Sequence, residues 1–382
     1  MKNILYLHAG AEMYGADKIL LELVTGLDKK KFKPIVILPN KGILKDRLEE
    51  VGIETYVIDY PILRRKYFTP RGIFNYVRKY RQSCQKIIRL LRQKSYNIDI
   101  LHINTTAVLE GIYLKKKLNA KLVWHVHEIL LKPKLVAKTI NHLVGRYSDQ
   151  VVVVSKAVKD HLIKSGNVKN DKVTVIYNGV DSERFKPGKP IDYLFKEWQI
   201  PKNAIKIGMI GRVNAWKGQN DFLEAAKILL AKNNQLYFFI IGSAFAGQEW
   251  RVDELRNSIL QVPDHNRIKY SEYRSDTPEL DDFFDLLVLP STNPDPLPTV
   301  VLEAMSSGTA VVGYRHGGVT EMVNDTVTGY LAEVNNPIDL AKKIELSISN
   351  SLEQLGKNAR ERILTKFSED NFIKSFEDIY SN

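Results

Sequence analysis

Short apolar runs alternate with longer amphipathic stretches along the chain, and this alternation governs the expected fold. Brief apolar runs between helix-length segments are typical of parallel strands with crossover helices. The first half contains such runs at residues 3–8, 34–38, 55–58, 99–103, 121–126 and 151–154. A second series follows at residues 205–211, 236–242, 268–270, 286–290 and 310–313. The sequence therefore predicts an α/β protein with parallel sheets.

Length and turn-forming residues predict two domains. A chain of 382 residues is long for one domain and suits two of roughly 150 to 200 residues. Turn formers gather at residues 175–181 and 185–190, where the linker is expected. We predict an N-terminal domain at 1–180 and a C-terminal domain at 181–365, with an amphipathic helix at about 366–382 that packs back on the first domain.

The net charge of +12 is unevenly distributed. Residues 1–185 carry 34 Lys plus Arg against 17 Asp plus Glu, so the remainder of the chain is net acidic. No acid lies between Asp59 and Asp99, where apolar residues recur at helical spacing. The pattern predicts a helix with one packed apolar stripe and a cationic outer face. The apolar positions are Ile73, Phe74, Val77, Tyr80, Ile87, Ile88 and Leu91, and the cations are Arg64, Arg65, Lys66, Arg71, Arg78, Lys79, Arg81, Lys86, Arg89, Arg92 and Lys94.

This cationic face suits an anionic membrane surface or a phosphorylated acceptor. A merely solvated helix stays open as an alternative, and nucleic acid is disfavoured because no recognised binding motif accompanies the charge. No apolar stretch has the length of a membrane span, and the N-terminus has the pattern of a buried strand. The single cysteine, Cys84, fits a reducing compartment, and no Cys or His cluster has metal-ligand spacing. We predict a cytoplasmic protein peripherally associated with the inner face of the cell membrane.

Two carboxylates eight residues apart form the most informative motif. Asp295 precedes Pro296, Leu297 and Pro298, and an apolar run then leads to Glu303. The first acid is expected on a loop and the second in a helix, where they could hold a polyol and a ribose. Alternatively, Asp295 caps the helix N-terminus and Glu303 is a solvated helix residue.

A second motif places Gly211, Arg212 and Lys217 between a predicted strand and a helix that begins near residue 220. A glycine at a strand end lets a phosphate approach the backbone, while the helix N-terminus, Arg and Lys supply amides and charge. The motif predicts a diphosphate cradle, with an ordinary surface loop as the alternative.

Two motifs in the first half lie where strands end. Gly15 and Ala16 follow the first strand in a loop that differs from the dinucleotide fingerprint, which disfavours a hydride-transfer enzyme. Strand alternation puts His125 and His127 on one side of the sheet, with Glu128 next in the chain. A core role is the alternative for each histidine, and a zinc site lacks further ligands nearby in the sequence.

Taken together, these motifs resemble those of the retaining family 4 glycosyltransferases. The Gly-Arg-x4-Lys-Gly motif is complete at residues 211–218, and the acid pair matches except that Asp295 stands where the family usually has Glu. The resemblance implies the GT-B architecture, with two Rossmann-like domains facing across a cleft. It also implies a nucleoside diphosphate sugar as donor substrate, no cofactor and no required metal.

The resemblance further implies roles for individual residues. Arg212 and Lys217 would bind the diphosphate and stabilise the leaving group, Glu303 would hold the ribose, and His127 would contact the transferred sugar or the acceptor hydroxyl. The expected catalytic residues are His127, Arg212, Lys217 and Asp295. The expected donor-binding residues are Gly15, Ala16, Gly211, Arg212, Lys217, Asp295, Pro296, Leu297, Pro298 and Glu303, and the expected acceptor-binding residues are Tyr14, His127 and Glu128.

The expected acceptor is a glycan or a polyprenyl-diphosphate-linked sugar in the assembly of capsule or another surface polysaccharide. Two alternatives remain open at this point: a GT-B-fold nucleotide-sugar epimerase, which lacks an acceptor, and a nucleotide-sugar-binding protein without turnover. The sequence does not identify the nucleobase, the sugar or the linkage.

Overall fold

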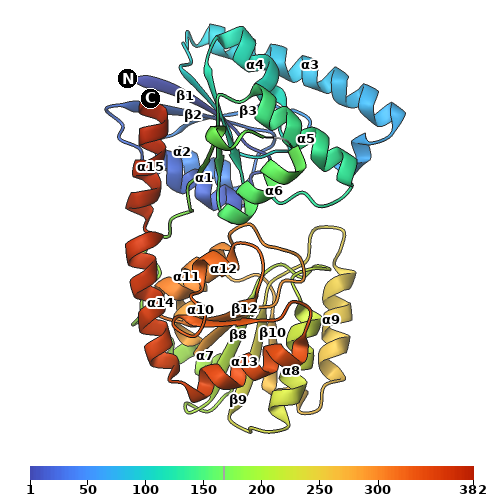
Figure 1. Cartoon of the computed structure of the whole chain (residues 1–382), viewed down its shortest axis with the longest axis vertical. Coiled ribbons are helices and arrows are strands. Elements are labelled where there is room, and N and C mark those ends of the chain that lie inside the picture. The colour runs from blue at the N-terminus through green and yellow to red at the C-terminus, as the bar shows by residue number, and fades with distance from the viewer. Residues whose placement is uncertain (167) are drawn as a thin grey trace. The chain divides into compact units, whose positions relative to one another are not determined.

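The computed structural model describes residues 1–166 and 168–382. These residues form two compact units (Figure 1). Unit 1 comprises Met1–Asn178 with Asp370–Asn382, and unit 2 comprises Gly179–Glu369. Each unit is a parallel sheet with helices on both faces, which confirms the predicted fold class.

The sheet of unit 1 contains seven strands within the described residues, in the order β3-β2-β1-β4-β5-β6-β7. All six predicted runs are strands, and β7 was not predicted because its three residues adjoin turn formers. The strands are β1 (Lys2–Leu7), β2 (Phe32–Leu38), β3 (Glu54–Val57), β4 (Ile100–Ile103), β5 (Lys121–Val126), β6 (Gln150–Val153) and β7 (Val173–Val175).

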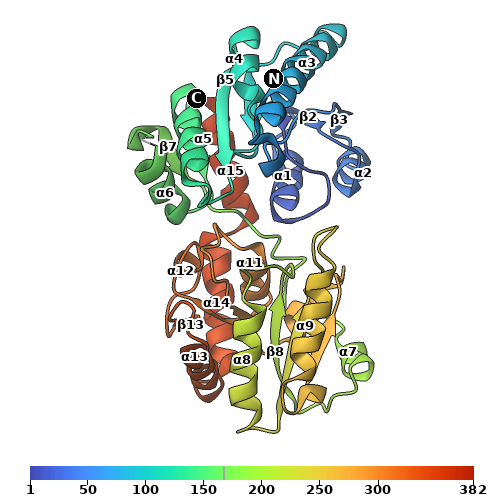
Figure 2. The same ribbon diagram turned by 90° about the vertical axis from the view of Figure 1, so that its right-hand side faces the viewer.

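Helices of unit 1 cover both faces of this sheet (Figures 1 and 2). Because the β1 to β2 and β2 to β3 crossovers run opposite to those that follow, α1 and α2 lie on one face and α3 to α6 on the other. The helices are α1 (Gly15–Gly26), α2 (Ile43–Glu50), α3 (Pro70–Gln93), α4 (Glu110–Leu118), α5 (Lys134–Tyr147), α6 (Lys156–Gly166) and α15 (Glu369–Ser381), with 3-10 turns η1 (Arg65–Tyr67) and η2 (Asn170–Lys172).

The C-terminal helix α15 completes the core of unit 1. Its Phe372, Phe376 and Tyr380 are buried with side chains of α1, α2 and the sheet. The Lys2 Nζ donates hydrogen bonds to the carbonyl oxygens of Tyr380 and Ser381, each at 2.8 Å, so the two chain ends lie side by side (Figure 1).

Unit 2 has six strands among its described residues, in the order β10-β9-β8-β11-β12-β13. All five runs of the second predicted series are strands. Strand β13 was not predicted, because its short segment begins with a glycine. The strands are β8 (Ile205–Ile210), β9 (Leu236–Ile241), β10 (Ile268–Ser271), β11 (Leu286–Leu289), β12 (Ala310–Tyr314) and β13 (Gly329–Ala332).

One large core cluster joins this sheet to α8, α9 and α13, with Phe222 and Phe238 fully buried in it. On the other side, Phe239 packs against Phe283 and Phe284. The helices of unit 2 are α7 (Asp192–Glu197), α8 (Gln219–Leu230), α9 (Trp250–Leu260), α10 (Thr277–Phe283), α11 (Thr299–Ser306), α12 (Val319–Met322), α13 (Pro337–Ser349) and α14 (Leu352–Lys366), with the 3-10 turn η3 (His265–Arg267).

The prediction of one packed stripe along the basic helix is only half right. In α3 the C-terminal half packs through Cys84, Ile87 and Leu91, which are buried. In the N-terminal half, Ile73 is 56% exposed and Phe74 is 74% exposed. Helical spacing identifies a common face but does not show that a partner element covers its whole length. The first turns of α3 thus present apolar side chains beside the cations.

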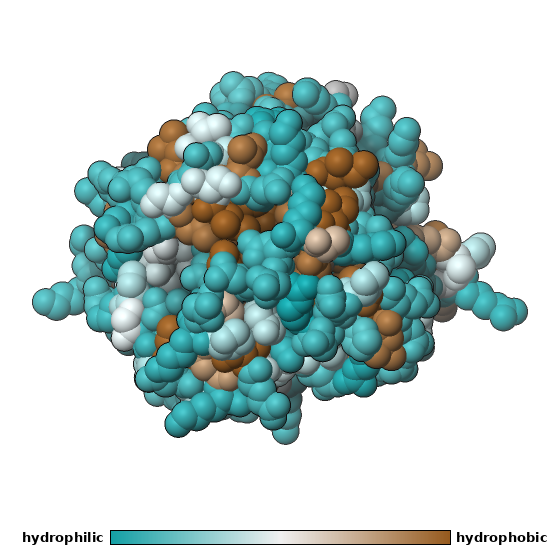
Figure 3. Space-filling view, turned by 90° about the horizontal axis from the view of Figure 1, so that it is seen from below, coloured by the Kyte–Doolittle hydropathy of each residue, from teal (hydrophilic) through white to brown (hydrophobic). Residues whose placement is uncertain are grey.

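Single apolar residues are exposed elsewhere too, which is normal for a globular protein. The face in Figure 3 is mostly hydrophilic, with apolar side chains in separate patches. Across the described residues, no helix combines the length and hydropathy that a bilayer span requires.

Candidate functional site

All the predicted donor-binding residues except Gly15 and Ala16 lie in unit 2, near the point where its strand order reverses. Chain connections leave β8 toward β9 on one side and later return to β11 on the other side. Such a switch point opens a crevice at the carboxyl ends of parallel strands, where α/β proteins bind ligands. Gly211 directly follows β8, and Ser291 lies just beyond β11.

Gly218 fixes how the loop after β8 enters helix α8. It has a φ of +84°, and a Cβ there would lie 1.8 Å from the carbonyl oxygen of Pro290. Only glycine permits this left-handed conformation and close approach together. The N-terminus of α8 is therefore held against the end of β11, which brings Lys217 beside the acidic motif.

Lys217 and Asp295 form a buried ion pair. The Lys217 Nζ lies 2.7 Å from the Asp295 Oδ2, and both side chains are mostly buried. The Ser291 hydroxyl donates to the same carboxylate oxygen at 2.9 Å. The guanidinium of Arg212 lies over the Phe245 ring, 3.5 Å from its centroid. Two cations, a carboxylate and a helix N-terminus thus meet at one edge of the sheet.

The backbone around Asp295 is held by a glycine pair from the next loop. The amide of Gly318 donates to the Asp295 carbonyl oxygen at 2.8 Å. A Cβ at Gly317 would lie 2.4 Å from that oxygen, and one at Gly318 would lie 2.1 Å from the Pro296 carbonyl oxygen. The Asp295 loop is therefore fixed in place by close backbone packing.

The acid pair adopts the predicted loop and helix positions, and both structural alternatives are wrong. Asp295 does not cap α11, because Pro298 is the N-cap residue. Glu303 lies within α11 and is only 4% exposed, so it is not a solvated helix residue. Leu297 is also buried, between the two flanking prolines. The motif therefore contains two buried carboxylates, one on the loop before α11 and one within the helix.

In unit 1 the strand order reverses between β1 and β4. The first residues after β1, β4 and β5 are His8, Asn104 and His127, so three adjacent strands end in polar side chains. The His127 Nε2 lies 3.0 Å from the Asn104 Oδ1, and the Asn104 Nδ2 lies 3.1 Å from the His8 Nδ1. Of these three side chains, only His127 was predicted from the sequence as a site residue. A search for polar residues directly after each predicted strand would also have found Asn104.

Burial lowers the pKa of three histidines at and behind this edge, His102, His125 and His127. His125 and His127 lie on one side of β5 as predicted, with ring centroids 3.9 Å apart. Burial and the neighbouring His8 and His102 lower the pKa of His127, and burial lowers the pKa of His102 to about 3. Both nitrogens of His125 are buried without a hydrogen-bond partner among the described residues, so this ring is a core side chain but not a satisfied one.

Glu128 holds the loop after β4. Its carboxylate accepts hydrogen bonds from the hydroxyl of Thr105 and from the amide and hydroxyl of Thr106. Burial raises the pKa of Glu128 despite these bonds. Glu128 thus contacts residues of unit 1, and its predicted contact with the acceptor substrate stays a prediction.

The loop after β1 leads through Tyr14, which is 41% exposed, into Gly15 and Ala16 at the start of α1. Asp17 ties this loop down, because its Oδ2 accepts from the amides of Glu12 and Tyr14 at 3.2 and 3.0 Å. Gly15 and Ala16 are therefore the first residues of a helix that begins near the carboxyl end of β1.

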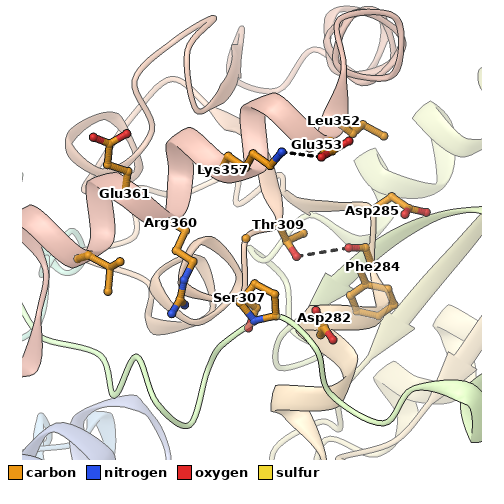
Figure 4. A pocket seen from close by; sticks show the side chains of 13 residues that line it. Asp282, Phe284, Asp285, Ser307, Thr309, Leu352, Glu353, Lys357, Arg360 and Glu361 are labelled. Atoms are coloured by element: carbon orange, nitrogen blue, oxygen red, sulfur yellow. Dashed lines mark hydrogen bonds and ion pairs between the residues drawn. The ribbon is translucent and has the colours of Figure 1, made fainter.

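Two cavities of unit 2 lie at opposite edges of its sheet. One of about 170 Å³ lies beside Asn214 and Gly218, in the loop that carries Lys217. Another, of about 600 Å³, lies at the amino ends of β11 and β12, beside Asp285 and Thr309 (Figure 4). Its Lys357 is paired with Glu353 at 2.6 Å. Despite its size, the larger cavity lies away from the carboxyl edge where the predicted residues gather.

Comparison with known proteins places each half of the chain in a family. A model described as Glycosyltransferase Family 4 matches residues 13–184, and one described as Glycosyl transferases group 1 matches residues 191–362. The two matches together span most of both units.

Individual relatives extend over nearly the whole chain. An *Escherichia coli* UDP-Gal:alpha-D-GlcNAc-diphosphoundecaprenol alpha-1,3-galactosyltransferase is 25% identical, with 94% of this chain and 95% of that protein covered. A *Campylobacter jejuni* N,N'-diacetylbacillosaminyl-diphospho-undecaprenol alpha-1,3-N-acetylgalactosaminyltransferase is also 25% identical, covering 94% of this chain and 92% of that protein. The crystal structure of *Anabaena* HepE with UDP and glucose has a TM-score of 0.85 at 25% identity and covers both chains completely.

Proposed function

Since the chain belongs to the family 4 glycosyltransferases, which have the GT-B fold, we propose that it transfers a sugar from a UDP-sugar to a polyprenyl-diphosphate-linked saccharide, with retention of anomeric configuration. The observation that carries the proposal is the Lys217–Asp295 pair beside Arg212 at the switch point of unit 2. It joins a phosphate-binding cation to an acid that can hold sugar hydroxyls.

In the proposed reaction, the bond between the anomeric carbon and the phosphate oxygen breaks, and a bond from that carbon to the acceptor oxygen forms on the same face. The proton of the acceptor hydroxyl moves to the departing phosphate oxygen. Arg212, Lys217 and the N-terminus of α8 stabilise the charge that develops on UDP, so no metal ion is required. Glu303 holds the ribose, and Asp295 with the backbone of Pro296, Leu297 and Pro298 holds the sugar.

The proposed substrates rest on the relatives. HepE crystallised with UDP and glucose, and the *E. coli* relative is named for a UDP-galactose donor and a diphosphoundecaprenol acceptor. An acceptor of this kind carries a diphosphate and a polyprenyl chain. We accordingly place the protein in surface-polysaccharide assembly, such as capsule, at the cytoplasmic face of the membrane.

Helix α3 supports the membrane assignment. Its N-terminal half exposes Ile73, Phe74 and Val77, and the exposed cations Arg71 and Arg78 flank them. An amphipathic helix of this kind binds an anionic bilayer through apolar insertion and charge, at about 1 kcal/mol per cation near the surface. The exposed surface of α3 therefore contains apolar side chains as well as cations, although the sequence predicted that these apolar side chains would be packed.

The donor assignment is tested by thermal stabilisation with UDP, GDP, dTDP and ADP, each with and without common sugars. We expect UDP to raise the melting temperature of the wild type and to have little effect on Arg212→Ala. Lys232→Ala, which removes an exposed cation of the same unit, is the matched control and should respond like the wild type. Stabilisation by none of the nucleotides would refute the donor assignment.

Turnover separates the proposal from its alternatives. Incubation of a UDP-sugar with a synthetic polyprenyl-diphosphate saccharide should give one new glycosidic bond, whose anomeric configuration NMR would report. Isomerisation of the donor without acceptor would favour an epimerase, and binding without any product over a panel of donors and acceptors would favour a non-catalytic protein.

Membrane association is tested with liposomes that contain anionic lipid. Replacing Arg78, Lys79, Arg89 and Arg92 by Gln should release the protein, and Phe74→Ser should weaken binding without changing the charge. Ile338→Ser, which alters a side chain 74% exposed on α13, is the matched control for Phe74→Ser. Unchanged binding after the fourfold replacement would refute the membrane role of α3.

A further inference from the structure

Asn104 is the centre of a hydrogen-bond network at the carboxyl edge of unit 1. Its side chain is fully buried. The Oδ1 lies 3.0 Å from the Nε2 of His127 and 3.4 Å from the Nε2 of His102. The Nδ2 lies 3.1 Å from the Nδ1 of His8 and 3.4 Å from the carbonyl oxygen of Ala16. These four contacts use both lone pairs and both protons of the amide, so its hydrogen-bonding capacity is filled.

The partners at the ends of the network fix which atoms carry protons. The His8 Nε2 lies 2.5 Å from the carboxylate Oδ1 of Asp17, and an ionised carboxylate only accepts. The Ala16 carbonyl oxygen also only accepts, so the amide nitrogen of Asn104 faces it, and the neighbouring Nδ1 of His8 accepts from that nitrogen. The Tyr380 oxygen accepts from the Tyr6 hydroxyl at 3.1 Å, which leaves the Tyr380 hydroxyl to donate to the Nδ1 of His102 at 2.7 Å and the proton of His102 on Nε2. Both ends thus direct the amide oxygen of Asn104 toward His127.

An amide oxygen can only accept, so the proton of neutral His127 must be on Nε2. The remaining ring nitrogen, Nδ1, then carries a lone pair. No partner for this atom lies among the described residues, and the side chain is half-buried rather than enclosed. A hydroxyl group of a ligand could donate to it.

We propose that Asn104 is a positioning residue that holds His127 in the Nε2–H tautomer, so that His127 presents Nδ1 as an acceptor to a hydroxyl of the sugar or the acceptor. The contact between His127 and substrate rests on the proposed function, whereas the tautomer does not. His8 and Asp17 act through Asn104, and they link the start of α1 to the same histidine.

The tautomer can be measured in the resting protein. Long-range ¹H–¹⁵N spectra of ¹⁵N-histidine-labelled protein at pH 7.5 should show His127 as a single Nε2–H tautomer, with the signal assigned through His127→Gln. Asn104→Leu removes the amide at similar volume, and we expect the His127 signal to become a mixture of tautomers. Asn104→Asp keeps an accepting oxygen beside Nε2 and should keep the single tautomer. It serves as the second variant if Asn104→Leu does not fold. Asn141→Leu, which removes another buried amide of unit 1, should leave the His127 signal unchanged.

Activity gives an independent readout. Asn104→Leu should lower kcat by roughly 10- to 100-fold, because a loosely oriented catalytic group loses its geometry. The affinity for UDP should not change, and Asn104→Asp should restore part of kcat with a pH profile shifted upward. A His127 Nδ1–H tautomer in the wild type, or an unchanged tautomer in Asn104→Leu, would overturn the inference. The expected spectra without any transferase activity would instead refute the proposed function and leave the network intact.

Discussion

The strand order reverses in the same way in both sheets, but the side chains that gather at the two carboxyl edges differ in charge. In unit 1 the switch point holds histidines and an asparagine whose hydrogen bonds are saturated, and burial keeps His102 and His127 neutral. In unit 2 the switch point holds the Lys217–Asp295 ion pair beside Arg212. The carboxyl edge of unit 1 therefore presents neutral imidazole rings, and that of unit 2 presents fixed charges.

The difference suits the proposed reaction, in which the two edges bind different groups. Fixed cations act on a developing negative charge without reorganisation at the moment of reaction, which suits a departing diphosphate. Neutral rings with assigned protons suit hydroxyl groups, which need one donor or acceptor at a defined place. The proposed transfer requires both kinds of group.

The largest expected effect comes from removing the cation of the Lys217–Asp295 ion pair in unit 2. Lys217→Ala should lower kcat/KM by about 10²- to 10³-fold, since it removes one stabilising cation and leaves Asp295 buried without its partner. Steady-state kinetics with the UDP-sugar would measure this. Lys227→Ala, an exposed lysine of α8, should remain within about twofold of the wild type. A loss below about tenfold for Lys217→Ala would contradict the assigned role.

A smaller effect is expected at the other buried acid of unit 2. Glu303→Gln should weaken UDP binding by about tenfold or more, because a hydrogen bond to a charged group contributes about 1.5 to 3 kcal/mol. Isothermal titration calorimetry would report the change. Glu361→Gln at the opposite cavity is the matched control, and equal weakening by both variants would show a general loss of charge instead of a ribose contact.

A buried carboxyl group of unit 1, Glu110, makes the stability of the protein depend on pH. Burial raises the pKa of Glu110 to about 8, with a hydrogen bond from Ser83 as a partial offset. Between the ordinary carboxyl pKa and 8 the unfolded state binds fewer protons than the folded state, so stability falls as pH rises through this window.

Glu110→Gln should consequently raise the melting temperature by about 2 °C or more at pH 9 and change it little at pH 4. Differential scanning calorimetry at both pH values would measure the shift. A stabilisation of the same size at both pH values would indicate a packing effect and contradict the titration.

The smallest effect is expected where this chain departs from its family. Asp295→Glu adds one methylene to a buried side chain that contacts Lys217 and Ser291. We expect a melting temperature within about 3 °C of the wild type and a changed ranking among UDP-sugars, because the carboxylate advances toward the sugar. A competition assay with several UDP-sugars would show the ranking, and an unchanged ranking would exclude Asp295 as a specificity residue.

Most of the fold could be predicted because parallel strands buried on both faces have near-continuous apolar runs. The exceptions, β7 and β13, are short and lie beside turn formers or begin with glycine. Periodicity also assigned Phe74 to a packed stripe, although the residue is exposed, because a pattern does not report which neighbours are present.

Prediction of the sites was limited by a different physical cause. Spacing in the sequence located Asp295, Glu303, Arg212 and Lys217, yet it could not show that Lys217 and Asp295 are in contact. That contact depends on Gly218 and Gly317, which bring separate loops together.

Asn104 was missed because a single amide after a strand has no motif of its own. Its three imidazole partners come from three different strands.

The position of α15 in the core of unit 1 has a consequence for synthesis. A ribosome releases residues 179–369 as one continuous segment, so unit 2 can close its core while the chain is still being made. Unit 1 starts first but lacks Phe372, Phe376 and Tyr380 until the ribosome has passed all of unit 2. The unit encoded first is thus completed last, and its exposed apolar surface must be protected from aggregation for the whole interval.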